Sequence, residues 1–80
     1  MEPTDYIPID CSLYSEYELA IMHRERLRLS WRDAGGNVHI GIVTPIDLRT
    51  RSSAEFLVVR ERDGEALTIR LDRIVQFSRV

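Results

Sequence analysis

The sequence predicts a mostly β protein, in which one N-terminal helix caps a small, partly closed barrel of five short strands. Three observations lead to this fold class. From residue 24 onward, apolar and polar residues alternate with the period of two that half-buried strands show. Turn signals interrupt this alternation, and Asp63-Gly64 is the strongest of them. Five short strands cannot build two covered sheets, and partial closure leaves few exposed edges.

The helix is expected after an irregular segment that carries Pro3 and Pro8. Ser12 is a suitable N-cap, and the acidic residues that follow it favour the positive end of the helix dipole. The helix runs for about ten residues, and a helix this short needs the rest of the domain to persist. Its apolar face is expected to consist of Leu19, Met22 and either Tyr14 or Tyr17.

A hairpin is predicted around the turn at residues 33–37. Its two strands cover residues 26–32 and residues 38–42. Thr44-Pro45 ends the second of these strands, and residues 45–54 are expected to form a polar connector.

Three further strands follow the connector. Residues 56–61 begin with apolar residues on both faces, which predicts a central strand. Residues 67–71 form the next strand, and residues 74–77 form the last one after a tight corner at Asp72-Arg73. The side chains predicted to form one buried core are Leu27, Leu29, Trp31, Val38, Ile40, Val58, Leu67, Ile69 and Leu71.

The length of 80 residues predicts one domain, with an acidic arm and helix in residues 1–23 and the barrel in residues 24–80. No apolar run approaches the ~20 residues that cross a bilayer, and the N-terminus is acidic where a signal peptide is basic. We therefore expect a cytoplasmic protein that does not contact the membrane. Cys11 is the only cysteine, so an internal disulfide is excluded.

The net charge of −2 hides a strong asymmetry along the chain. Residues 1–22 carry five acidic side chains and no Lys or Arg, whereas residues 23–80 carry all eleven arginines with eight acidic side chains. Such an acidic arm either meets a basic partner or complements its own domain.

Catalysis is the less favoured function. A nucleophile built from Cys11, with His23 or His39 as base and Asp10 or Asp47 behind it, has no specific spacing. A lone thiol without an activating site is more often a small buried apolar residue. One cysteine and two isolated histidines also lack metal-ligand spacing. We expect no enzyme activity, no cofactor and no metal.

Two charged clusters are candidates for binding. The first is an arginine-rich strand, which suggests either an RNA-binding face or a solvated face whose arginines pair with Glu65 or Asp72. No stacking aromatic accompanies these arginines, so the solvated reading is preferred, and an RNA-binding module remains the alternative. Its members are Arg24, Arg26, Arg28 and Arg32.

The second cluster contains all three tyrosines, interleaved with acidic residues. Carboxylates beside phenolic rings imitate the charge and ring faces of single-stranded nucleic acid, although the rings can equally pack the helix onto the barrel. Its members are Asp5, Tyr6, Asp10, Tyr14, Glu16, Tyr17 and Glu18.

The sequence resembles the Rof family of Rho inhibitors. The most specific likeness is the run Tyr6-Ile7-Pro8-Ile9-Asp10-Cys11-Ser12-Leu13-Tyr14, followed by Glu18-Leu19-Ala20 and His23. The segments Glu55-Phe56-Leu57-Val58-Val59, Leu71-Asp72-Arg73-Ile74 and Phe77-Ser78 also resemble the family, in one register from about Asp5 to Ser78.

This resemblance implies an Sm-like barrel that binds the N-terminal, RNA-engaging region of Rho and blocks its primary RNA sites, which gives antitermination. It implies a protein partner, no direct contact with nucleic acid, and a monomer when free. The implied partner-binding residues are Tyr14, Ser15 and Glu18 on the helix and Arg51 and Ser53 on the connector, with Glu16 as an additional acid. The chain departs from the family at Ser12, Leu13 and Ser15, where relatives are more acidic.

The predicted core leads to a stability test at Ile69. Replacing Ile69 with alanine should lower the free energy of unfolding by ~2–5 kcal/mol, the usual cost of truncating a core aliphatic side chain. Thermal and chemical denaturation measure this change. An unchanged melting temperature would contradict the assignment of Ile69 to the core.

Overall fold

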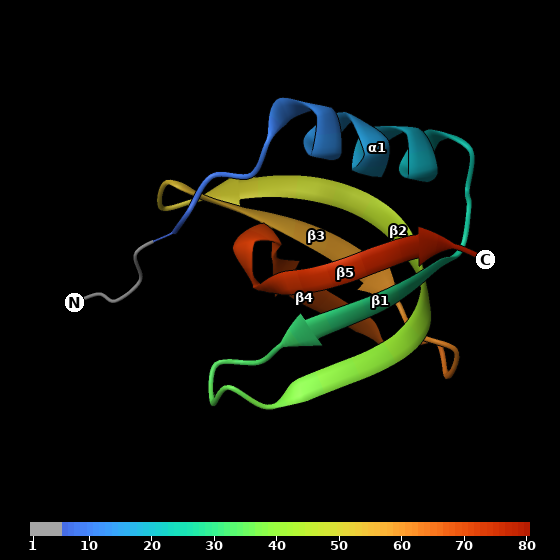
Figure 1. Ribbon diagram of the computed structural model, residues 1–80. Coiled ribbons are helices and arrows are strands. Elements are labelled where there is room, and N and C mark those ends of the chain that lie inside the picture. The colour runs from blue at the N-terminus through green and yellow to red at the C-terminus, as the bar shows by residue number, and fades with distance from the viewer. Residues whose placement is uncertain (1–5) are drawn as a thin grey trace.

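The computed structural model describes residues 6–80, so Asp5 and the rest of residues 1–5 lie outside the described part of the chain. One helix, α1, precedes five strands, and a single 3-10 turn, η1, joins the last two (Figure 1). In order, the elements are α1 Cys11–Met22, β1 Leu27–Arg32, β2 Val38–Arg51, β3 Ala54–Arg60, β4 Ala66–Arg70, η1 Leu71–Arg73 and β5 Ile74–Arg79. The helix within residues 6–80 is neither long nor apolar enough to cross a membrane.

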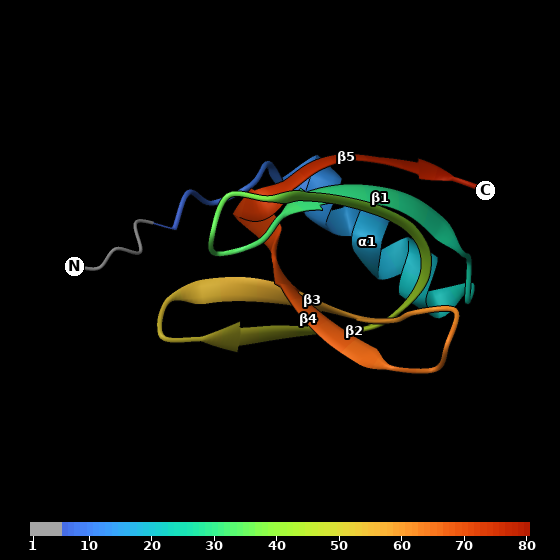
Figure 2. The same cartoon turned by 90° about the horizontal axis from the view of Figure 1, so that it is seen from below.

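The five strands form one antiparallel sheet in the order β4-β3-β2-β1-β5. Seen from below, the sheet curls so that β1 and β5 lie opposite β3 and β4, with α1 across one end (Figure 2). Within residues 6–80 no ladder joins the edge strands β4 and β5. The predicted helix and five strands are confirmed, the sheet is not closed, and the Sm-like assignment stays a prediction.

Strand β2 continues through Pro45, so the predicted strand end at this residue and the connector at residues 45–54 are wrong. The first half of β2 pairs with β1, and its second half, from Thr44 to Arg51, pairs with β3. The register shifts between Pro45 and Asp47, which marks a β-bulge. Ile46 is the residue left without a partner at this bulge, next to Pro45, which pairs with Val59. A bulge bends the strand, and proline within a sheet is found at such irregular places.

Three tight turns connect the strands. At the predicted first turn, the Asp33 side chain accepts backbone hydrogen bonds from Gly35 and Asn37, each at 2.9 Å. At the predicted second turn, Gly64 has a φ of +92°, which glycine adopts without steric cost. The third turn, between β2 and β3, places Ser52 and Ser53 at φ values of 51° and 67°.

The core lies between the curled sheet and α1. Of the predicted core residues, Leu67 is partly buried, and those confirmed as buried are Leu27, Leu29, Trp31, Val58, Ile69 and Leu71. Tyr17, one of the two tyrosines expected on the apolar face of the helix, is also buried. The buried residues outside the predicted core are Ala20, Val43, Pro45, Ala54, Leu57 and Val59.

Val38 and Ile40 were expected in this core, and that expectation is wrong, because they are 56% and 73% exposed. Ile40 pairs with Ser30, on the outer face of the sheet. The inner face of β2 is taken instead by His39, which stacks on Trp31 with ring centroids 5.6 Å apart, and by Gly41. A Cβ at Gly41 would lie 3.9 Å from the indole, an ordinary van der Waals distance, so position 41 lies beside the tryptophan.

Helix α1 differs from its prediction at its start and in its apolar face. Asp10, rather than Ser12, is the N-cap residue, and the Ser12 hydroxyl donates to the Asp10 carboxylate at 2.7 Å. Tyr17 and Ala20 are buried, whereas Leu19 and Met22 are 41% and 72% exposed. The Tyr17 ring packs against Phe77 of β5 at 5.1 Å between centroids, so the helix is anchored through position 17.

The strained turn between β2 and β3 leads to a second stability prediction. Replacing Ser53 with glycine should raise the free energy of unfolding by about 1 kcal/mol, because a residue with a side chain pays for positive φ and glycine does not. Ser78→Gly is the matched control, since Ser78 is an exposed serine in β5 whose φ is not positive, and it should destabilise the fold. A stability loss in the Ser53→Gly variant would contradict this account of the turn.

Candidate functional site

Helix α1 carries three of the partner-binding residues that the sequence singled out. Tyr14 is half-buried, whereas Ser15 and Glu18 are exposed. Tyr14 and Glu18 stand one turn apart and share a face of the helix. Tyr14 and Ser15 also line a surface hollow together with Ile9, Cys11 and Glu55. The helix face therefore adjoins the start of β3.

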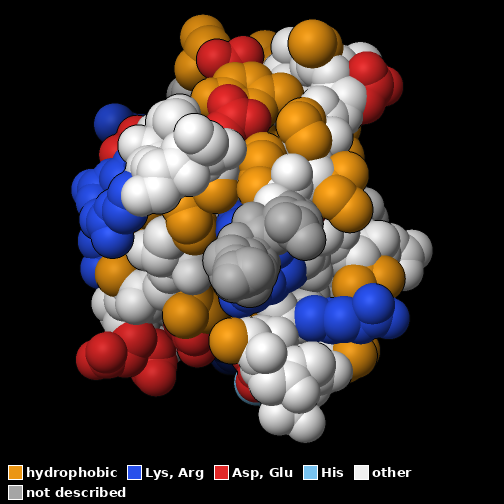
Figure 3. Space-filling view, turned by 90° about the vertical axis from the view of Figure 1, so that its left-hand side faces the viewer, with side chains coloured by type: hydrophobic (Ala, Val, Ile, Leu, Met, Phe, Trp, Pro, Cys, Tyr) orange, Lys and Arg blue, Asp and Glu red, His pale blue; other side chains and the backbone are white. Residues whose placement is uncertain are grey.

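The electrostatics of this region centre on the Tyr14 phenol. Burial, followed by the negative charges of Glu55 and Glu18, raises the pKa of Tyr14. The ring thus lies near two carboxylates, one carried by the helix and one by the sheet. Viewed from the N-terminal side, hydrophobic and acidic side chains lie together over the start of α1, and basic side chains lie lower on both flanks (Figure 3).

Glu16 occupies a different side of the helix from Tyr14, as expected for residues two positions apart. Its carboxylate accepts a hydrogen bond from the Arg79 guanidinium of β5 at 2.6 Å. The same guanidinium donates to Glu25 at 2.9 Å. Glu16 therefore links the helix to the last strand.

Arg51 is the last residue of β2 and Ser53 lies in the turn that follows it, and both are exposed. Arg51 lines a separate hollow with Arg49, Phe56 and Thr68. This hollow is distinct from the one beside Tyr14. Consecutive residues of β3 line the two hollows: Glu55 lines the one beside Tyr14, and Phe56 lines this one.

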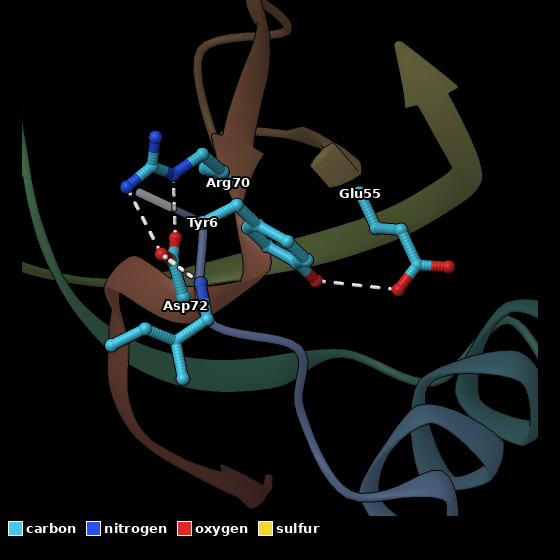
Figure 4. Close-up of polar contacts among 5 residues, drawn as sticks. Tyr6, Glu55, Arg70 and Asp72 are labelled. Carbon is cyan, nitrogen blue, oxygen red and sulfur yellow. Dashed lines mark hydrogen bonds and ion pairs between the residues drawn. The ribbon is translucent and has the colours of Figure 1, made fainter. Parts of the chain in front are cut away.

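Contacts with Glu55 and Arg70 hold Tyr6, which precedes the helix, beside this region (Figure 4). The Tyr6 hydroxyl donates to the Glu55 carboxylate at 3.3 Å, and the Arg70 guanidinium lies 5.8 Å from the centre of the Tyr6 ring. Asp72 binds Arg70 through two hydrogen bonds of 2.6 and 3.0 Å and accepts the backbone N–H of Ile7 at 3.0 Å. Burial and the charge of Glu55 raise the pKa of Tyr6 to about 12.

Sequence reasoning missed Glu55 as a site residue. Glu55 was named only as the first residue of a segment that resembles the family, because a single acid beside an apolar run gives no signal of a site. Tyr6 was noted in the tyrosine cluster and in the family motif, but its contact with Glu55 joins residues 49 positions apart in the chain. Local spacing carries no signal for such a pair.

The arginine-rich strand faces solvent, as Arg24, Arg26, Arg28 and Arg32 are exposed. The suggested ion pairs with Glu65 or Asp72 are not formed within residues 6–80, where Asp72 pairs with Arg70. The outer side chains next to this strand are aliphatic on β2 and polar on β5, where Gln76 and Ser78 lie. Trp31 is only 8% exposed. This face therefore offers charge without an aromatic stacking platform.

The suggested nucleophile is not assembled by the fold. Cys11 begins α1 and His23 follows its last residue, so about 18 Å of helix separates them. His39 instead contacts Asp33 at 2.8 Å, and this hydrogen bond, with those from the backbone of Asn37 and Gly35, lowers the pKa of Asp33 to about 2. Among residues 6–80 no group of His, Cys, Asp and Glu side chains is arranged to hold a metal.

Comparisons with known proteins add a family and a fold. Residues 8–80 match a family model described as modulator of Rho-dependent transcription termination (ROF). Over 73 residues the chain is 40% identical to protein rof of Escherichia coli (strain K12) and to protein rof of Shigella flexneri, which covers 91% of this chain and 81% of either relative.

A solved structure also resembles the chain. Proteasome accessory factor B/C (PafBC) of Arthrobacter aurescens superposes with a TM-score of 0.78 over 95% of this chain at 18% identity. The chain corresponds to 12% of the length of that protein, and at this identity the likeness is one of fold alone.

The buried tyrosines predict a loss of stability in alkali. Burial raises the pKa of Tyr17 to about 12. Burial and the charge of Glu55 raise the pKa of Tyr6 to about 12 as well, whereas tyrosine in an unfolded chain has a pKa near 10.0. Between these pH values the unfolded state binds fewer protons, so the free energy of unfolding falls as pH rises. The Tyr17 contribution is about 2 to 3 kcal/mol. Denaturation from pH 9 to 12 measures the decline, and Tyr17→Phe should make it shallower. An equally steep decline in that variant would contradict the assignment.

Proposed function

The chain belongs to the ROF family of modulators of Rho-dependent transcription termination, and from this premise we propose that it is a protein inhibitor of Rho. In this proposal an Sm-like domain spanning residues 1–80 acts in the cytoplasm as a monomer. It binds the N-terminal, RNA-engaging region of Rho and keeps RNA from the primary sites. Termination is suppressed by occlusion, without a chemical step.

One observation carries this proposal, namely the exposed carboxylate of Glu18 beside the half-buried Tyr14 ring. Within residues 6–80 Glu18 forms no ion pair, in contrast to Glu16. An unpaired surface carboxylate can meet a basic partner without first breaking an internal contact. An aromatic ring next to it offers apolar area where a base would otherwise stack.

Charge distribution supports a basic partner for this surface. Opposite charges on the two proteins speed their encounter and make association sensitive to salt. An inhibitor that occupies an RNA site of Rho needs negative side chains where the RNA phosphates would bind. In this proposal Glu18 of the helix and Glu55 at the start of β3 supply these charges. Arg51 and Ser53, on the neighbouring turn, provide the second contact in this proposal.

An RNA-binding module that uses the arginine-rich strand is the competing function. The exposed residues Val38 and Ile40 lie beside this strand and are aliphatic. They make no favourable contact with RNA phosphate and offer no ring on which a base can stack. We therefore expect the isolated protein to bind single-stranded RNA weakly or not at all at physiological salt. Tight binding that is lost when Arg26 and Arg28 become alanine would favour the RNA-binding function instead.

The helix contact is tested by reversing the charge of Glu18. Glu18→Arg should abolish binding to Rho, because the new cation would face the basic site, and should leave the melting temperature nearly unchanged because the side chain is exposed. Titration calorimetry against Rho and thermal melts measure the two effects. Glu65→Arg is the matched control, since it makes the same charge change at an exposed residue of the β3–β4 turn. Wild-type affinity in a folded Glu18→Arg, Tyr14→Ala variant would place the contact elsewhere.

A further inference from the structure

Glu55 is a half-buried carboxylate without a counter-charge in the described part of the chain. Four other acidic side chains, Glu16, Glu25, Asp47 and Asp72, each contact a guanidinium group. Glu55 receives only the neutral hydroxyl of Tyr6, at the rather long distance of 3.3 Å. A partly desolvated carboxylate gains most from a nearby cation, and within residues 6–80 no such cation is placed beside it.

The surroundings of Glu55 point to where a cation would bind. Glu55 and Tyr14 line the same hollow, and Glu18 lies one turn along the helix from Tyr14. Two carboxylates from different elements therefore flank one aromatic ring. Carboxylates give charge-assisted hydrogen bonds to guanidinium or ammonium groups, and the ring face adds a cation–π attraction.

We propose that Glu55, Glu18 and the Tyr14 ring form a receptor for one cationic side chain, a guanidinium or ammonium group, of the protein partner. This inference rests on the proposed function and adds a sheet residue to the helix contact. In this proposal Glu55 connects the helix contact with the contact near Arg51 and Ser53, although Tyr14 and Arg51 line two separate hollows.

Tyr6 is the positioning residue of this receptor. The Arg70 guanidinium lies 5.8 Å from the centre of its ring, and Asp72 in turn orients Arg70 through two hydrogen bonds (Figure 4). The hydroxyl contacts only one oxygen of Glu55, Oε1, and so leaves the second oxygen for the cation. Because the phenol stays protonated at neutral pH, it remains a hydrogen-bond donor throughout the physiological range.

The experiment measures the affinity of the full chain for intact Rho by titration calorimetry over a series of salt concentrations. Glu55→Gln keeps an acceptor for Tyr6 and removes the charge. It should weaken binding about tenfold and make the salt dependence shallower, because one ion pair is lost. Glu61→Gln is the control, since it removes one charge near the far end of the same strand and should change affinity by less than about twofold.

Tyr6→Phe tests positioning, because it removes only the hydroxyl. It should weaken binding by about threefold in the wild-type background and have no further effect in the Glu55→Gln background. A purely structural role would instead appear as a lower melting temperature and as equal losses in both backgrounds. The Glu55→Gln measurement stands by itself if Tyr6→Phe lowers stability.

Two results overturn the inference. If wild-type protein binds Rho and folded Glu55→Gln binds equally tightly with an unchanged salt dependence, the receptor is wrong and the proposed function stands. If wild-type protein does not bind Rho, the proposed function fails and the receptor for a cation of that partner fails with it.

Discussion

The bend of β2 at the Pro45 bulge is the constraint on which the rest of the structure depends. Upstream of the bulge the strand pairs with β1, and downstream it pairs with β3. One continuous strand therefore serves two parts of the sheet that face each other (Figure 2). Helix α1 packs chiefly over β2, so the bend also sets where the helix rests. Through β2 the start of β3 comes close to the first turns of the helix.

Ion pairs within the protein determine which acidic side chains remain available to bind a partner. Arg79 engages Glu16 and Glu25, and Arg70 engages Asp72. These pairs lie where elements distant in the sequence meet, and they fix the helix, the N-terminal segment and the last strand relative to one another. Glu18 and Glu55 are not used in this way within residues 6–80. The acids that form ion pairs within residues 6–80 are thus different from those that we propose meet the partner.

The family, the single helix and the five strands were predictable from the sequence, and the comparisons and the structure confirm them. Val38 and Ile40 were misplaced because alternation fixes which residues share a face but not which face is buried. In the structure the inner face of this part of β2 carries His39, which stacks on Trp31, and Gly41, which pairs with Leu29. Pro45 was read as a strand end because a bulge depends on the partner strand, which local sequence does not reveal.

Some residues of the candidate site could also be predicted from the sequence, and others could not. Tyr14 and Glu18 could be found because a one-turn spacing on a predicted helix places them on one face. Glu16 was included because it is acidic and nearby, but its ion pair joins residues 63 positions apart. Glu55 could not be recognised as a neighbour of Tyr14 before the bend of β2 was known. Whether these residues and the Arg51–Ser53 turn contact Rho stays a prediction.

Hydrogen–deuterium exchange of the protein with and without Rho tests the central claim most directly. The account predicts that Rho slows exchange in residues 9–22 and 50–56, which include α1 and the turn between β2 and β3. Exchange in residues 26–42, the arginine-rich strand and its hairpin partner, should be unchanged. Protection of residues 26–42 with none in α1 would contradict the account.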